Sequence, residues 1–181
     1  MSGHGAHIDP SNKRIALLIA LLALVLAFSE TLGKASQTSA LTLNIEASNL
    51  WAFFQAKTIR QTVLRTAAEQ AAVSSSSEDS KKQIETWKKT AERYQSEPET
   101  NEGRKELADR AKAAEAKRDR AMAAYHQYEL ASAAVQIAIV LASAAIITGA
   151  MALTWIGIGL GVVGVVFCLI GFFAPTAVHL F

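Results

Sequence analysis

The chain ends in LASAAVQIAIVLASAAIITGAMALTWIGIGLGVVGVVFCLIGFFAPTAVHLF, residues 130–181, and this stretch decides the fold. Its 52 residues include no Asp, Glu, Lys or Arg. A globular domain in water needs charged side chains over its surface. The stretch therefore indicates burial in a membrane rather than an ordinary soluble fold.

The apolar stretch is too long for one membrane-spanning helix and suits two. We expect transmembrane helices at residues 130–153 and 154–174, joined by a very short link near Leu153. So short a link forces an antiparallel hairpin. Pro175 ends the last helix because proline cannot continue the backbone hydrogen bonding, which leaves residues 175–181 as a C-terminal tail.

A further apolar run, at residues 15–28, follows Lys13 and Arg14. A positive flank before a short apolar core is also typical of a signal peptide. Helical continuation beyond the run brings its length close to the hydrocarbon thickness of a bilayer. We therefore interpret it as a first transmembrane helix at residues 15–33, preceded by an N-terminal tail at residues 1–14.

Residues 34–129 carry nearly all of the charge. They hold 16 of the 18 Lys and Arg residues and 14 of the 16 Asp and Glu residues, and they are rich in strong helix formers. We expect helices at residues 35–73 and 80–129, with a turn at residues 74–79 and a second break at residues 96–98. The predicted fold is an all-α membrane protein: three transmembrane helices with a long, coiled-coil-like helical hairpin stalk between the first and the second.

Local patterns within the stalk agree with this prediction. Ser80 has the spacing of a capping box and is expected to start the second stalk helix. Glu85–Lys89 and Glu106–Arg110 are expected ion pairs one helical turn apart. A heptad stripe, with Arg118 as its one violation, is formed by Leu107, Ala111, Ala114, Ala121, Tyr125 and Tyr128.

Each predicted span carries a ridge of small residues at spacings of four and three. The ridges are Ala16, Ala20, Ala23 and Ala27 in the first span, Ala138, Ala142, Ala145, Gly149 and Ala152 in the second, and Gly157, Gly161, Gly164, Cys168 and Gly171 in the third. Small residues let helix backbones approach closely within a bilayer. Packing within one three-helix chain explains two of the three ridges, so we expect a homo-oligomer.

Glu30 continues the first ridge about one turn inside the membrane boundary. An ionisable residue at that depth is costly and marks a functional-site hypothesis. Lys34, one turn further on, and Gln136 of the second span are its expected partners. Two interpretations stay open: Glu30 caps the bundle in an ion pair with Lys34, or a ring of Glu30 carboxylates lines a cation path.

Residues 49–65, NLWAFFQAKTIRQTVLR, combine aromatic and basic side chains on a helix. One narrow packing face is predicted from Ala52, Ala56, Ile59, Val63 and Ala67, and a second face from Leu50, Phe54, Lys57, Gln61 and Arg65. A partner helix, an anionic lipid headgroup or a phosphate would contact Trp51, Phe54, Lys57, Arg60 and Arg65. In the alternative, the aromatic residues pack between subunits and the bases are solvated. Residues 35–56 contain one charge, Glu46, which favours burial in an assembly.

The sequence offers no catalytic group, cofactor site or metal site for the function. The net charge of +2 is spread over a balanced segment, which excludes a nucleic-acid-binding footprint. The single cysteine, Cys168, lies in an apolar span. Ser2-Gly3-His4 would suit Cu(II) only if Met1 were removed.

Several of these segments resemble a bacterial membrane-protein family known only as domain of unknown function 4337. They are SETLGK at residues 29–34, ASNLWAFFQAKTIR at residues 47–60, SEPET at residues 96–100, and Ala174-Pro175. The resemblance extends over nearly the whole chain. It implies a bacterial integral membrane protein and carries over no catalytic residue.

We therefore expect a non-enzymatic structural or accessory scaffold for a membrane complex, one that self-associates in the lipid bilayer. The alternative is an oligomeric ion channel or transporter subunit with Glu30 lining the path. The expected location is the bacterial cytoplasmic (inner) membrane, as a multi-pass protein. Lys13 and Arg14 favour a cytoplasmic N-terminus, whereas the bases before residue 130 favour a cytoplasmic stalk, and three spans cannot satisfy both. We expect the stalk in the cytoplasm.

Overall fold

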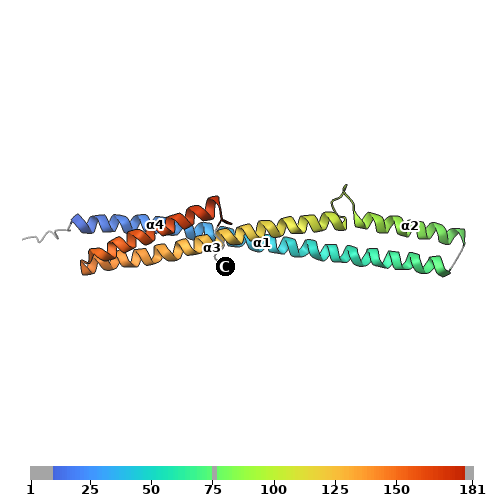
Figure 1. Ribbon diagram of the computed structural model, residues 1–181, viewed down its shortest axis with the longest axis horizontal. Coiled ribbons are helices and arrows are strands. Elements are labelled where there is room, and N and C mark those ends of the chain that lie inside the picture. The colour runs from blue at the N-terminus through green and yellow to red at the C-terminus, as the bar shows by residue number, and fades with distance from the viewer. Residues whose placement is uncertain (1–9, 75–76, 178–181) are drawn as a thin grey trace, which may run out of the picture. The chain divides into compact units, whose positions relative to one another are not determined.

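The computed structural model describes residues 10–74 and 77–177 of the chain, and these residues form four helices and no strand (Figure 1). The helices are α1 (Pro10–Ser74), α2 (Glu78–Gln95), α3 (Arg104–Thr148) and α4 (Met151–Phe173). Three of them, α1, α3 and α4, are long and apolar enough to cross a membrane. The predicted all-α fold with three membrane-spanning helices is thereby confirmed.

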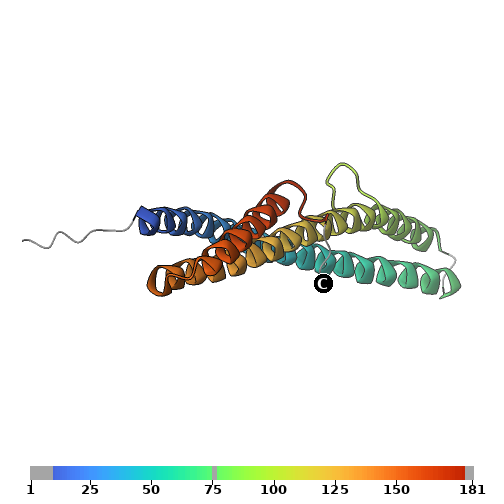
Figure 2. The same cartoon turned by 60° about the vertical axis from the view of Figure 1, so that its left-hand side comes forward.

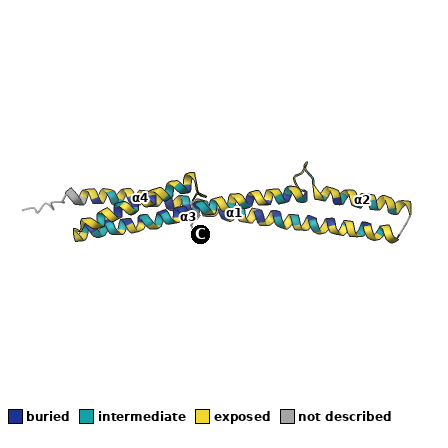
Figure 3. Cartoon of the chain, viewed as in Figure 1, coloured by how far each residue is buried: buried dark blue, intermediate teal, exposed yellow. Residues whose placement is uncertain are grey.

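The chain divides into two compact units, which we describe separately. The membrane unit contains the chain up to Ala40 and from Asp119 onward, and the stalk unit is Leu41–Arg118. Both α1 and α3 contribute residues to each unit. Burial in both units is confined to stripes along the helices, so most of the apolar surface of the spans faces outward (Figure 3).

In the membrane unit, α4 folds back along α3 (Figures 1 and 2). The two helices approach so closely that a Cβ atom at Gly157 would lie 3.1 Å from the carbonyl oxygen of Ala138. A Cβ atom at Gly164 would lie 3.1 Å from the carbonyl oxygen of Ala131. Helix α1 packs on this pair through Ile15 and Leu22, which join two buried clusters with α3.

The turn between α3 and α4 lies earlier than predicted. Helix α3 ends at Thr148 and α4 begins at Met151, so the link is Gly149-Ala150 and not residues near Leu153. Gly149 has a φ of +69°, a left-handed conformation that glycine adopts without a steric penalty. Gly149 was predicted to continue a packing ridge, but among the described residues nothing packs against it: Gly149 is exposed and follows the last residue of the helix.

The stalk unit has a small core of short and branched side chains. Ala47 and Leu50 of α1 are buried against Leu107, Ala111 and Ala114 of α3. These last three belong to the predicted heptad stripe, whose packing role is confirmed for them. Along α2, Ala91 is buried, and its carbonyl oxygen accepts a hydrogen bond from Gln61 at 2.8 Å.

The start of α2 differs from the predicted capping box. Helix α2 begins at Glu78, and its N-cap is Ser77, whose hydroxyl accepts a hydrogen bond from the amide of Ser80 at 3.2 Å. Ser80 thus lies in the first turn of the helix and does not cap it. An earlier start also places Glu78 and Asp79 in the first turn, where carboxylates are stabilised by the helix dipole.

The predicted break at residues 96–98 is confirmed and extends up to the start of α3 at Arg104. Glu106 closes it: its carboxylate accepts hydrogen bonds from the Ser96 hydroxyl at 2.6 Å and the Glu97 amide at 3.2 Å. The predicted Glu106–Arg110 ion pair is therefore wrong, and Arg110 donates instead to the Asn101 carbonyl oxygen at 3.2 Å. The Glu85–Lys89 pair is present at 2.9 Å.

Candidate functional site

A polar pocket of about 500 Å³ lies between α1 and α3 in the membrane unit. It holds the two residues that the sequence marks most strongly, Glu30 and Lys34. Across from them, α3 contributes Tyr125, Tyr128 and Glu129. The pocket therefore combines two carboxylates, one ammonium group and two phenols at the point where the apolar spans meet the charged segment.

Glu30 is held from α3 and not from its own helix. Its Oε1 atom accepts a hydrogen bond from Gln136 Nε2 at 3.3 Å. The ion pair that was predicted with Lys34 is absent among the described residues, since both side chains are exposed and Glu30 reaches sideways to α3. A neutral amide on the facing helix thus provides the hydrogen-bond partner of Glu30.

Buried hydroxyl groups lie beside the pocket. Ser29 is fully buried, and its hydroxyl donates within α1 to the carbonyl oxygen of Val25 at 3.0 Å. Ser132 of α3 donates to the Ser29 hydroxyl at 3.1 Å and so joins the two helices. The sequence signal for Ser29 is a spacing of seven residues: Ile15, Leu22 and Ser29 follow one another at that interval, which places Ser29 as a polar residue on a packing face.

The first small-residue ridge is not used within the chain. Its members Ala16, Ala20, Ala23 and Ala27 are all exposed, as is Glu30. The other two ridges are buried where they cross: Ala138, Ala142 and Ala145 in α3, and Gly157, Gly161, Gly164 and Gly171 in α4. Packing within one chain therefore accounts for the ridges of α3 and α4. The ridge of α1 remains exposed.

Most of the aromatic and basic motif is engaged inside the stalk unit. The indole N–H of Trp51 donates to Glu115 Oε1 at 2.9 Å. Lys57 is only 5% exposed, with its ammonium nitrogen 3.3 Å from Glu97 Oε2. The same nitrogen lies 5.4 Å and 5.3 Å from the ring centroids of Phe53 and Tyr94. These contacts stabilise the hairpin, and they leave Arg60 and Arg65 as the exposed basic residues of the motif.

Sequence reasoning missed a residue on which polar contacts converge in the stalk, Arg104. Its guanidinium donates to Thr58 at 2.8 Å, to Gln61 at 2.6 Å and to Gln95 at 2.8 Å. It also lies 5.0 Å from the centroid of the Phe54 ring. Side chains from three helices meet at this arginine, and no local pattern around residue 104 indicates such a convergence.

The two predicted faces of the motif have opposite environments. The face that contains Leu50, Lys57 and Gln61 is buried within the stalk unit. The face predicted for packing is instead open: Ile59 and Val63 are 64% and 60% exposed, and Ala52 and Ala56 are exposed beside them. Ile45, seven residues before Ala52, is 62% exposed on the same side.

Metal chemistry gains no support from the part of the chain that the structure describes, since no group of three His, Cys, Asp or Glu side chains there could hold an ion. The copper-binding hypothesis for Ser2-Gly3-His4 falls outside the described residues.

No curated protein and no solved structure matches the chain. A family profile, in contrast, matches residues 11–174, which include α3, α4 and most of α1. The chain belongs to the family described as Domain of unknown function (DUF4337).

Proposed function

We propose that this protein is a non-enzymatic scaffold that self-associates in the bacterial cytoplasmic membrane and presents its stalk to a partner membrane complex. The observation that carries the proposal is the exposed ridge of α1, Ala16, Ala20, Ala23 and Ala27. The equivalent ridges of α3 and α4 pack inside the chain. A close helix contact therefore remains to be made by α1 alone.

The physical argument rests on what drives helices together in lipid. Lipid tails are as apolar as leucine, so helix association depends on close packing and weak polar contacts and not on the hydrophobic effect. A row of alanines permits that close approach, as the contact between Gly157 and Ala138 illustrates within the chain. A second copy of α1 supplies a ridge of the same kind, and the symmetric pairing of equal surfaces is the commonest route to a dimer.

A second surface, in the stalk unit, supports self-association independently. The open face of Ile45, Ala52, Ala56, Ile59 and Val63 carries no charged side chain. In water, a contiguous apolar strip of this kind marks an interaction surface. Its spacing of three and four residues is that of a helix which packs against another helix.

The test is to fill the ridge in the membrane unit. Ala20→Leu combined with Ala23→Leu should weaken self-association about tenfold in detergent, because bulky side chains separate the backbones. The measurement is sedimentation equilibrium or native mass spectrometry of the full chain. Ala133→Leu makes the same change at an exposed position of α3 and should leave the assembly intact. Equal association of all variants would contradict the proposal.

The second candidate function is an ion channel or transporter subunit with Glu30 in the path. It is favoured by the exposure of Glu30 on the side of α1 that carries the ridge, since association through the ridge brings carboxylates of several copies near one another. Glu30→Gln discriminates between the two candidates in reconstituted liposomes. A large change in cation flux supports a channel, whereas intact assembly with no flux in either form excludes it.

Arg60 and Arg65 are the residues through which we expect the stalk to contact its partner or a lipid headgroup, because both are exposed. We further expect the stalk to lie in the cytoplasm. Protease treatment of inverted membrane vesicles measures this directly: a cytoplasmic stalk is cleaved in inverted vesicles and protected in intact cells.

A further inference from the structure

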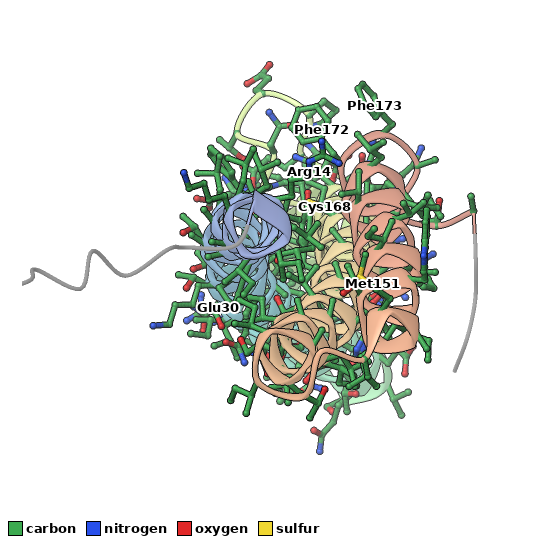
Figure 4. The ribbon with its side chains drawn as sticks, turned by 90° about the vertical axis from the view of Figure 1, so that its left-hand side faces the viewer. Arg14, Glu30, Met151, Cys168, Phe172 and Phe173 are labelled. Carbon is green, nitrogen blue, oxygen red and sulfur yellow. The ribbon has the colours of Figure 1, made fainter. Side chains whose placement is uncertain are left out.

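A second cavity in the membrane unit lies between α1 and α4 and differs in chemistry from the polar pocket. Its volume is about 430 Å³, and its walls include Arg14, Ile15, Leu18, Met151, Thr154 and Trp155. It is found at the ends of the spans where α1 and α4 begin. Figure 4 shows Arg14 on the side of α1 toward α4, with Glu30 on the other side of the helix.

The cavity has one charged residue at its rim and apolar walls. Arg14 is exposed and forms no ion pair with any residue that the structure describes. Ile15, Leu18 and Met151 present only apolar surface. Among the described residues that line the cavity there is no Asp or Glu. An amphiphile with an apolar tail and a negative headgroup therefore complements these residues, whereas an amine finds no counterion among them.

Two further groups suit such a ligand. The Thr154 hydroxyl is buried without a hydrogen-bond partner among the described residues, which is costly unless a ligand or water satisfies it. Trp155 is 71% exposed, as expected of an indole at the membrane–water interface, where its N–H meets polar headgroups. Both residues lie near the start of α4 and line the cavity.

We propose that this cavity is a binding site for an anionic phospholipid. The Arg14 guanidinium binds the phosphate in the fork geometry that arginine offers to phosphate oxygens. One acyl chain lies along Ile15, Leu18 and Met151. The Thr154 hydroxyl donates to an ester or phosphate oxygen of the lipid. This site is separate from the exposed ridge of α1, so it extends beyond self-association and does not depend on it.

Neighbouring lysine and arginine residues provide a matched test. Lys13 and Arg14 carry the same charge at adjacent positions, but only Arg14 lines the cavity. The full chain in detergent is titrated with phosphatidylglycerol or phosphatidylcholine, and bound lipid is counted by native mass spectrometry. We expect phosphatidylglycerol to bind about tenfold more tightly than phosphatidylcholine, Arg14→Gln to remove that preference, and Lys13→Gln to keep it.

A second variant removes the hydroxyl group and keeps the shape of the side chain. Thr154→Val should weaken phosphatidylglycerol binding severalfold and leave the fold intact, because the hydroxyl has no partner to lose among the residues that the structure describes. Equal loss in Lys13→Gln and Arg14→Gln would show attraction to surface charge only and would overturn the proposal. Displacement of the bound lipid by inorganic phosphate would also overturn it, since phosphate lacks the acyl chain that the cavity holds.

Discussion

The membrane unit and the stalk unit hold their helices together in different ways. In the membrane unit, contact comes from backbone approach at small residues, as at Gly157 and Gly164. In the stalk unit, buried polar side chains do much of this work, with Lys57 and Gln61 inside and Arg104 connecting three helices. The solvent explains this difference. In water the hydrophobic effect drives the burial of apolar side chains, and polar networks can form beside them. In lipid that driving force is missing, so helix association depends on close packing.

The largest effect should come from breaking a close approach in the membrane unit. Gly164→Leu places a side chain against Val135 and the Ala131 backbone, and it should destabilise the bundle by about 3 kcal/mol. Gly159→Leu is the matched control, because nothing lies within 4 Å of a Cβ atom there. Thermal unfolding in detergent measures both variants. Equal stability of the two would mean that backbone approach does not hold α3 to α4.

An intermediate effect is expected from the polar network of the stalk. Arg104→Met removes three hydrogen bonds and leaves the side-chain carbonyl oxygen of the buried Gln61 without its arginine donor, at a cost of about 2 kcal/mol. Arg65→Met changes an exposed arginine and should cost no more than about 0.5 kcal/mol. Chemical denaturation followed by far-UV circular dichroism compares them. A cost for Arg104→Met as small as that of the control would show that apolar contacts alone hold the stalk.

The smallest expected effect is on the pH dependence of stability, through the carboxyl group of Glu106. Hydrogen bonds from the Ser96 hydroxyl and from backbone amides lower the pKa of the Glu106 carboxyl below its ordinary value. The folded pKa is therefore below the unfolded one, so the stabilisation is complete above an unfolded pKa of about 4.3 and is lost as pH falls through the lower folded value.

Glu106→Gln should accordingly reduce the acid sensitivity of unfolding in this window, as followed by circular dichroism of the full chain between neutral pH and pH 3. Glu99→Gln, at an exposed glutamate of the same connecting segment, serves as the control. If both variants titrate like the parent chain, the carboxylate of Glu106 does not stabilise the break between α2 and α3.

The membrane unit was largely predictable from sequence because the absence of charge locates the spans directly. The position of the turn was not, since Gly149 continues the spacing of a ridge and nothing local reveals its positive φ. In the stalk, the start of α2 was ambiguous because several serines in a row can each cap a helix. Arg104 could not be identified, because its role depends on Thr58, Gln61 and Gln95 meeting in three dimensions.

The candidate site shows the same limit. That Glu30 lies on the exposed side of α1 with the ridge was readable from its spacing after Ala27. Its partner was a choice between Lys34 and Gln136, and the choice depends on how α1 and α3 are rotated against each other. The sequence also could not tell which of the three ridges stays exposed. The packing of all three spans determines that it is the ridge of α1.

The two-residue link Gly149-Ala150 has a consequence for where the two ends of the hairpin lie. It is too short to let α3 and α4 run in the same direction, so the two spans cross the membrane in opposite directions. The end of α4 then returns to the surface at which α3 enters, as the contact of Gly171 with Tyr128 requires. A reporter placed after α4 therefore reads the same side of the membrane as the residues just before the second span, and the opposite side from Arg14.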